Sequence, residues 1–300
     1  MARGDLRSIT VIGHLTIDEI VRDGEILENM GGVACYTSLA ARAMGSDVKV
    51  ISMVGEDFPE KYLEVLSNAG IDVSKIAKLV EAKTTRFRIR NIGDLREMWL
   101  EARAPRIKID EVEGDAIYLG PVARELLIED IKRLVSRHDR VLLDPQGILR
   151  ESDESNRVRL VKIDLSFPGL WALKTSIEEG QVITDAIEPE AIVDRLHELA
   201  EIILLTMGKR GAIVSDRSKK FLIPTYETKA IDPTGAGDVF GGAFLAEFLR
   251  SGEIDWASAV GSAAASIAVE GHGFLPLLSK DFRREAYKRA ELIHERVRRI

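Results

Sequence analysis

The sequence predicts a doubly wound α/β fold with a mostly parallel sheet and helices on both of its faces. Two observations carry this prediction. Short, continuously apolar runs such as 201–206 are separated by stretches with helical periodicity, as in buried parallel strands joined by helices. The run 116–120, a helix over about 124–137 and the run 140–144 give the strand–helix–strand spacing of a right-handed parallel crossover.

The other elements follow from the same patterns. We expect further strands at 8–13, 48–55, 171–176 and 212–214, and further helices over 33–40, from 59, from 238 and over 256–270. Two segments, about 15–29 and 84–102, alternate between polar and apolar residues, which is typical of half-exposed strands. Asp23–Gly24 supplies a hairpin turn in the first segment. These two segments are expected to form a small separate sheet.

Composition excludes several classes of protein. The chain has 300 residues, is 45% hydrophobic and carries a net charge of −7, which argues against a general nucleic-acid-binding surface. The single cysteine, Cys35, excludes an intramolecular disulfide framework and fits a reducing, cytoplasmic location. We expect no membrane span and no signal peptide, because no apolar run has the required length or flanks.

The most informative stretch is 231–250, IDPTGAGDVFGGAFLAEFLR. Its apolar residues recur at helical spacing, so Gly235-Ala236-Gly237-Asp238 forms the first turn of a buried helix. Amides in such a turn lack partners within the helix and favour an anion such as a phosphoryl group. Asp238 would repel that anion, which makes sense if it takes a proton from an attacking hydroxyl. The simpler alternative is that Asp238 only favours the helix start.

This stretch resembles the C-terminal signature of the PfkB carbohydrate kinases, the ribokinase-like family, whose pattern is D-T-x-G-A-G-D. The resemblance implies one kinase domain over residues 1–300, with a ribokinase-like, mostly parallel sheet and a small β lid formed by about 15–29 and 84–102. It implies Asp238 as the catalytic base and Gly235, Ala236 and Gly237 as the anion hole. Pro233-Thr234 departs slightly from the family pattern.

The family also implies a substrate site. Asp18 follows a strand end and would bind substrate hydroxyls; as a residue in isolation it is an ordinary loop aspartate. Gly31-Gly32 resembles the start of the family's substrate-binding helix, but Tyr36 stands where an asparagine is usual, which argues against standard ribokinase specificity. Together with Asp144-Pro145-Gln146-Gly147, this pattern resembles the myo-inositol kinase branch. Gln146 would bind substrate there, although it could equally cap a turn.

ATP and Mg²⁺ are the implied donor and metal. The segment Lys174-Thr175-Ser176-Ile177-Glu178-Glu179 resembles the family's K-x-N-x-x-E, so Ser176 and Glu179 would order the phosphates, with Glu179 holding Mg²⁺ through water. A first-turn Glu179 favoured by the helix dipole is the alternative. The nucleotide would lie against Thr206, Gly208 and Gly211, with Ser262 near the adenosine. Asp232 is the expected ligand of a monovalent cation such as K⁺.

The sequence therefore predicts an ATP-dependent kinase that phosphorylates a hydroxyl of a small-molecule sugar or cyclic polyol, with a myo-inositol-like acceptor favoured. A nucleoside kinase of the same fold is the alternative, with Tyr36 as a stacking aromatic. A non-catalytic nucleotide-binding regulator has no reason to keep Asp238. A Rossmann dehydrogenase would need GxGxxG after the first strand, which 13–15 does not provide. A homodimer through the lid is expected.

Overall fold

A ten-stranded sheet forms the centre of the protein. The computed structural model describes residues 7–22, 25–92 and 95–300, and within them the strand order is β16-β15-β14-β13-β12-β9-β8-β1-β4-β5. Pairing is parallel from β5 to β13, and the remaining strands continue antiparallel. The predicted mostly parallel α/β sheet is confirmed. The strands are β1 Ser8–Ile12, β4 Asp47–Gly55, β5 Asp72–Leu79, β8 Ala116–Leu119, β9 Val141–Leu143, β12 Ala172–Ser176, β13 Ile202–Thr206, β14 Ala212–Ser215, β15 Lys220–Ile223 and β16 Arg298–Arg299.

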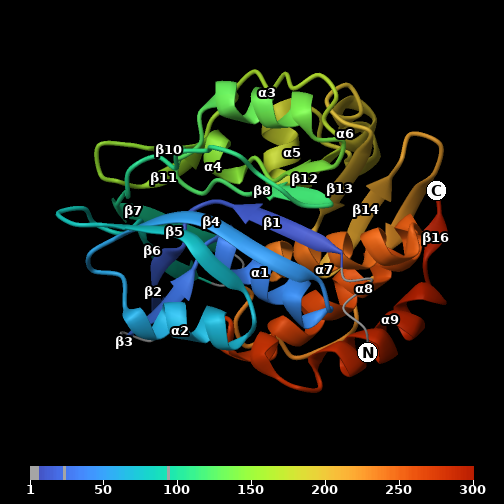
Figure 1. Cartoon of the computed structure of the whole chain (residues 1–300). Helices are drawn as coiled ribbons and strands as arrows, with labels where there is room; N and C mark the ends of the chain where they lie inside the picture. The colour runs from blue at the N-terminus through green and yellow to red at the C-terminus, as the bar shows by residue number, and fades with distance from the viewer. Residues whose placement is uncertain (1–6, 23–24, 93–94) are drawn as a thin grey trace.

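Helices cover both faces of this sheet (Figure 1). Helices α3, α5 and α6 lie on one face, and α1, α7 and α8 lie on the other, with α9 packed on α8. The helices are α1 Val33–Ala43, α2 Glu60–Asn68, α3 Ile128–Arg137, α4 Gln146–Leu149, α5 Ile177–Thr184, α6 Pro189–Leu196, α7 Ala236–Ser251, α8 Ile254–Ala268 and α9 Phe282–His294, with 3₁₀ turns η1 Gly208–Arg210 and η2 Leu275–Leu278.

Alternate residues of the central strands build two separate cores. Successive side chains of a strand point to opposite faces of the sheet. In β8, Tyr118 joins the core beneath α1, α7 and α8, while its neighbours Ile117 and Leu119 join the core beneath α3, α5 and α6. In β13, Leu204 likewise joins the core beneath α1, α7 and α8, while its neighbours Ile203 and Leu205 join the core beneath α3, α5 and α6. This is why the central strands are apolar throughout.

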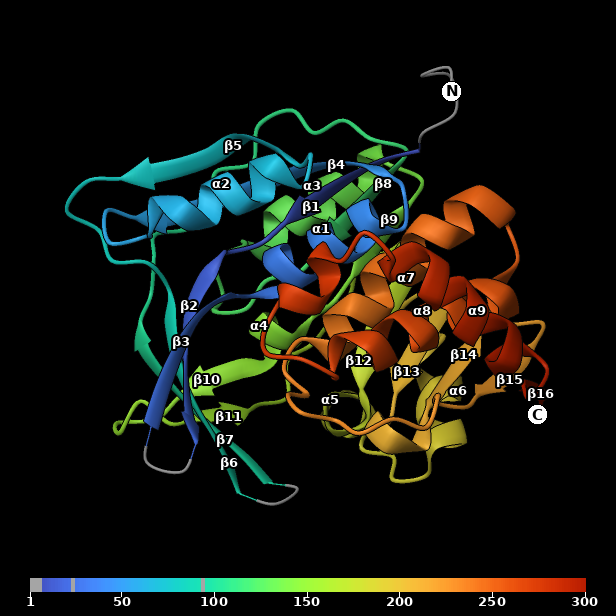
Figure 2. The same ribbon diagram turned by 90° about the horizontal axis from the view of Figure 1, so that it is seen from below.

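A second sheet contains the two segments predicted to alternate. Strands β2 Thr16–Arg22, β3 Glu25–Gly31, β6 Arg86–Ile92 and β7 Leu95–Ala102 pair in the order β3-β2-β6-β7. Figure 2 shows this sheet projecting from one side of the main body, where β2 continues from the end of β1. The turn predicted at Asp23–Gly24 lies outside the described residues. Strands β10 Arg150–Ser152 and β11 Val158–Leu160 form a short hairpin nearby.

Several helix boundaries differ from the prediction, and helix α1 continues three residues beyond its predicted end at position 40. Helix α3 begins at Ile128, four residues after the predicted start, because Arg124 adopts a left-handed conformation with φ 58°. Helix α8 runs from Ile254 to Ala268, two residues earlier at each end than predicted. Periodicity locates a helix well, but its ends depend on local backbone conformation.

A buried carboxylate fixes α7, the helix that carries the signature. Glu247 is 1% exposed and accepts hydrogen bonds from Trp256 Nε1 of α8 at 2.6 Å and from the Tyr287 hydroxyl of α9 at 2.9 Å. Arg250 donates to both oxygens of Glu247, at 3.0 and 2.5 Å. These bonds compensate the buried charge and connect the C-terminal part of α7 to α8 and α9.

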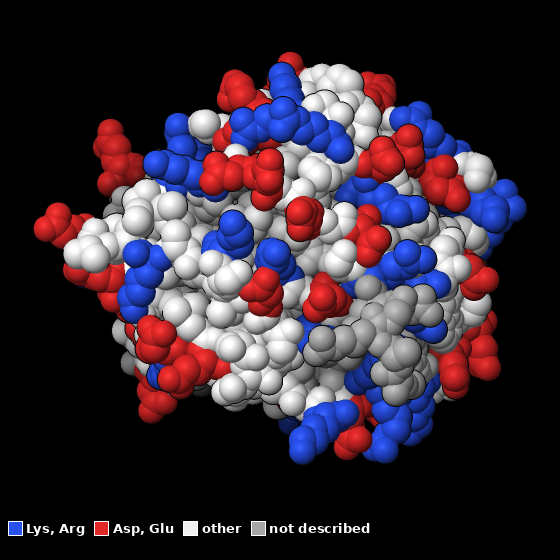
Figure 3. Space-filling view, in the orientation of Figure 1, with Lys and Arg blue, Asp and Glu red and all other residues white. Residues whose placement is uncertain are grey.

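Charged side chains of both signs are interspersed over the face shown in Figure 3, in a chain of net charge −7. Over residues 7–22, 25–92 and 95–300, no helix combines the length and apolarity needed to cross a bilayer.

Candidate active site

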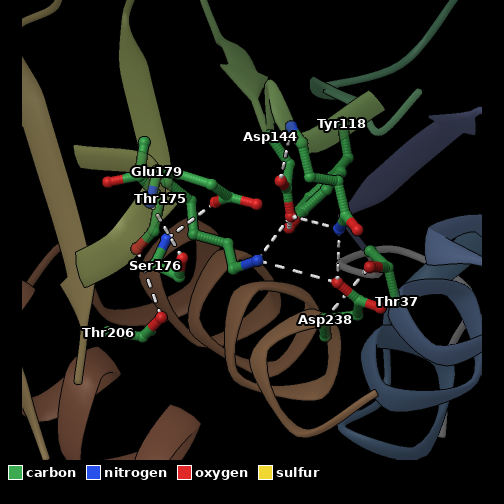
Figure 4. Close-up of polar contacts among 10 residues, drawn as sticks. Thr37, Tyr118, Asp144, Thr175, Ser176, Glu179, Thr206 and Asp238 are labelled. Carbon is green, nitrogen blue, oxygen red and sulfur yellow. Dashed lines mark hydrogen bonds and ion pairs between the residues drawn. The ribbon is translucent and has the colours of Figure 1, made fainter. Parts of the chain in front are cut away.

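The candidate site lies where the carboxyl ends of the parallel strands meet the start of α7. Ligands of open α/β sheets bind outside this edge. Asp144 follows β9, Ser176 ends β12 and Thr206 ends β13. All three lie at the edge of the sheet that faces Asp238 (Figure 4). The chain thus brings together residues that are as many as 94 positions apart, as between Asp144 and Asp238.

The glycines at the start of α7 have a steric cause. Gly235 precedes the helix with φ 76°, a left-handed conformation that favours glycine. A Cβ atom at this position would lie 2.4 Å from the ring of Tyr36. The Ala236 amide donates to the Pro233 carbonyl at 3.3 Å, so within the predicted anion hole the Gly235 and Gly237 amides are the candidates to bind an anion.

Asp238 is held from three directions. Its Oδ1 accepts a hydrogen bond from Gln146 Nε2 at 3.1 Å and lies 3.6 Å from Lys174 Nζ. Its backbone carbonyl accepts a hydrogen bond from Thr37 Oγ1 of α1 at 3.2 Å. The side chain is 14% exposed, so the carboxylate is positioned by the protein and still accessible. Gln146, expected from the resemblance to bind substrate, therefore lies in contact with Asp238.

Sequence reasoning missed Lys174 and Asp144 as members of this site. Lys174 is 4% exposed, Asp144 is fully buried, and Lys174 Nζ forms an ion pair with Asp144 Oδ2. Tyr118 donates to the same oxygen at 3.4 Å. Burial, together with Asp144 and Asp238, raises the pKa of Tyr118 well above its usual range, against the opposing effect of Lys174, so Tyr118 remains a neutral donor. The available signal was a lysine in the middle of a strand predicted to lie in the core.

The lid side of the site contains Asp18. Its Oδ1 accepts a hydrogen bond from Thr16 Oγ1 at 2.6 Å, and its carboxylate lies directly over Gly31. A Cβ atom at Gly31 would approach Asp18 Oδ2 to 2.0 Å, so glycine is required there. Asn29 pairs with Asp18 in register across β2 and β3, which places both residues on one face of the lid.

Tyr36 is packed more deeply than the prediction of a substrate contact implied. It is 2% exposed and its ring lies against Gly235. Burial first, and then the charges of Cys35, Asp18, Asp232 and Asp238, raise the pKa of its phenol well above the usual range. The role of Tyr36 in substrate binding stays a prediction. Gly32 caps the start of α1 with φ 84°, and Cys35 is fully buried beside it, as expected of a packed thiol.

On the donor side, Ser176 and Glu179 form a capping box at the start of α5. Ser176 Oγ accepts from the Glu179 amide at 3.2 Å, and Glu179 Oε2 accepts from the Ser176 amide at 2.8 Å. Glu179 is thus a first-turn residue, as in the alternative considered from the sequence, and its capping-box bond also fixes the carboxylate near the site. Burial, and next the charge of Asp144, raise the pKa of Glu179.

The remaining predicted donor residues lie around this edge. Thr206 Oγ1 donates to the Thr175 carbonyl at 3.2 Å, and Gly208 and Gly211 bound η1 with φ 58° and 90°. Ser262 Oγ donates to the Pro224 carbonyl at 2.8 Å. Asp232 is buried and accepts from the amides of Thr234 and Gly273, both at 3.0 Å. A cation bound by Asp232, as predicted, would have to share the carboxylate with these two amides.

Comparisons with known proteins show the family of this chain. Residues 112–280 match the family model described as pfkB family carbohydrate kinase. A cytidine kinase of Thermococcus kodakarensis is 27% identical over 256 residues, covering 81% of this chain and 88% of that protein. An inositol 3-kinase of Arabidopsis thaliana is 25% identical over 289 residues, covering 89% of this chain and 75% of that protein.

Solved structures show the same fold. A pyrophosphate-dependent kinase in the ribokinase family, in a sulfate complex, matches with a TM-score of 0.81 at 24% identity, over 93% of this chain and 99% of that one. The Methanocaldococcus jannaschii nucleoside kinase matches with a TM-score of 0.73 at 20% identity, over 96% and 99%. The chain belongs to the pfkB carbohydrate kinase family. It is a phosphotransferase that acts on a hydroxyl acceptor, and its ribokinase-like fold is confirmed.

Two glycines at opposite ends of α7 allow a matched test of the Tyr36 contact. Gly252 also has a left-handed φ, 72°, but no atom lies within 4 Å of its Cβ position. Both Gly235→Ala and Gly252→Ala should lose about 1–2 kcal/mol of unfolding free energy from backbone strain alone. Gly235→Ala should lose more, because its methyl group meets the Tyr36 ring. Urea denaturation measures both; equal losses would contradict the packing described here.

Proposed function

We propose that this chain is an ATP-dependent kinase that transfers the γ-phosphoryl group to a hydroxyl of a sugar or cyclic polyol, with a myo-inositol-like acceptor. The observation that carries the proposal is the position of Asp238. It is an accessible carboxylate in the first turn of α7, in contact with Gln146 and Lys174, beside amides suited to an anion. Simple phosphate binding gives no reason for a carboxylate there.

Each residue then has a defined task. Asp238 accepts the proton of the attacking hydroxyl, and Asp18 and Gln146 bind the acceptor so that this hydroxyl faces the phosphorus. The amides of Gly235 and Gly237 stabilise charge on the transferred group, whereas the Ala236 amide already donates to the Pro233 carbonyl. The lid, with Asp18 and Asn29 on one face, covers the acceptor and excludes water from the site.

The residues present fit magnesium held mainly by the phosphates of its nucleotide. Mg²⁺ bound with ATP keeps several waters and takes few protein ligands. Glu179 provides one carboxylate at the donor side, and among the described residues no cluster of three or more His, Cys, Asp or Glu is arranged to bind a metal alone. Glu179 would hold the ion through water, and the ion would neutralise phosphate charge. Asp232 is the proposed ligand of a monovalent cation such as K⁺.

The buried position of Tyr36 supports a polyol acceptor over a nucleoside. A nucleoside kinase would gain from an exposed aromatic ring that stacks on the base, and the ring of Tyr36 instead packs on Gly235. A nucleoside acceptor remains the second candidate, because similar proteins include a cytidine kinase and a nucleoside kinase of Methanocaldococcus jannaschii.

A screen of acceptors and donors tests the proposed reaction. Phosphoryl transfer should be measured with myo-inositol, ribose, fructose 6-phosphate and nucleosides, each with Mg-ATP and, separately, with pyrophosphate as donor. We expect ADP release with a polyol or sugar and Mg-ATP. Turnover on nucleosides alone would favour the second candidate, and turnover with pyrophosphate alone would overturn the assignment of ATP.

The role of Asp238 is tested by Asp238→Asn. Removal of a positioned base should lower kcat by about a hundred- to ten-thousand-fold, while folding and ATP binding persist, because the amide is nearly the same size. Steady-state kinetics and calorimetric titration with Mg-ATP measure both. Asp281→Asn, at the start of α9, is the control, since Asp281 is exposed and lies outside the site. Near-normal turnover of Asp238→Asn would exclude Asp238 as the base.

A further inference from the structure

The buried ion pair between Lys174 and Asp144 needs an explanation beyond folding. Lys174 is 4% exposed and Asp144 is fully buried. A buried ion pair contributes little net stability, because desolvation of both charges offsets their attraction. Such a pair beside a reaction centre is therefore a candidate for a functional role.

The position of the Lys174 ammonium relates it directly to Asp238. Besides its ion pair with Asp144, Nζ lies 3.6 Å from Asp238 Oδ1. It would also lie 3.4 Å from a Cβ atom added to Gly237. Gln146 Nε2 also contacts both carboxylates, at 3.1 Å for Asp238 and 3.4 Å for Asp144. The ammonium thus lies between two aspartates and next to the proposed anion hole.

Lys174 is a cation in contact with both aspartates. Two carboxylates that share a site do not both ionise readily, whereas a cation within about 4–6 Å favours ionisation. The titratable and charged groups around Lys174 are Asp144 after β9, Tyr118 of β8, Asp238 of α7 and Glu179 of α5. Burial lowers the pKa of Lys174, but these four groups together raise it well above its usual range, so Lys174 stays protonated.

We propose that Lys174 is a positioning residue whose ammonium, held by Asp144, keeps Asp238 ionised and oriented as the base of phosphoryl transfer. The same charge offsets the two carboxylates where the phosphates of the donor must approach. This inference rests on the function proposed above for Asp238. The geometry that supports it is the pair of contacts from one buried Nζ to Asp144 and Asp238.

The pH dependence of kcat/KM separates this role from a purely structural one. The value of kcat/KM should fall at low pH as Asp238 is protonated, and this fall is the acid limb of the pH profile. Lys174→Met removes the cation but keeps a side chain of similar length. Its acid limb should move to higher pH by about one unit or more. The double variant Lys174→Met/Asp144→Asn also removes the second carboxylate, so its acid limb should return toward that of the wild type.

Asp144→Asn alone provides an independent arm if Lys174→Met does not fold. With Asp144 replaced by a neutral amide, the ammonium of Lys174 acts on the Asp238 carboxylate alone, so the acid limb should move to lower pH. The acceptor is the one on which the wild-type enzyme turns over best with Mg-ATP, and circular dichroism defines the pH range in which each variant is folded.

Three results would overturn the inference: an acid limb of Lys174→Met that coincides with that of the wild type, a double variant that stays where Lys174→Met lies, or an acid limb of Asp144→Asn at higher pH. None of these results affects the role of Asp238 as the base, which fails only if Asp238→Asn turns over normally. If the wild type phosphorylates none of the acceptors, the proposed function fails and this inference with it.

Discussion

The balance of charge at the first turn of α7 is the constraint on which the rest of the structure depends. The proposed base, Asp238, is a carboxylate, and the phosphoryl group beside which it would act is also an anion, so the two would repel each other. In this proposal the amide end of α7 and the ammonium of Lys174, 3.6 Å from Asp238, compensate the repulsion. Both compensating groups are fixed by the fold rather than supplied by solvent.

The architecture explains how such an arrangement is held. The central strands place Asp144, Ser176 and Thr206 at one edge because parallel strands end on the same side of the sheet. Helix α7 brings Asp238 to this edge from the other layer, and the Glu247 network ties α7 to two further helices. The second sheet adds Asp18, so the two residues proposed to bind the acceptor, Asp18 and Gln146, come from different parts of the fold.

Much of the fold and part of the site followed from local patterns. Strands such as β13 were predicted because both of their faces are buried, and the Gly-Ala-Gly-Asp turn was predicted because its chemistry lies within one short segment. Lys174 and Asp144 were missed because a pairing across 30 residues depends on the order of strands in the sheet. Arg124 was placed in a helix because its left-handed φ leaves no signature in the composition. The packing of Tyr36 on Gly235 is likewise a tertiary contact between α1 and α7.

The central claim is that Asp238 faces the attacking hydroxyl while the first amides of α7 face the transferred group. A crystal structure with magnesium, a non-hydrolysable ATP analogue and the preferred acceptor tests this most directly. We expect an acceptor hydroxyl within about 2.6–3.2 Å of an Asp238 carboxylate oxygen, and the terminal phosphate of the analogue on the amides of Gly235 and Gly237. An acceptor whose hydroxyl faces a different side chain, or a phosphate bound away from α7, would contradict it.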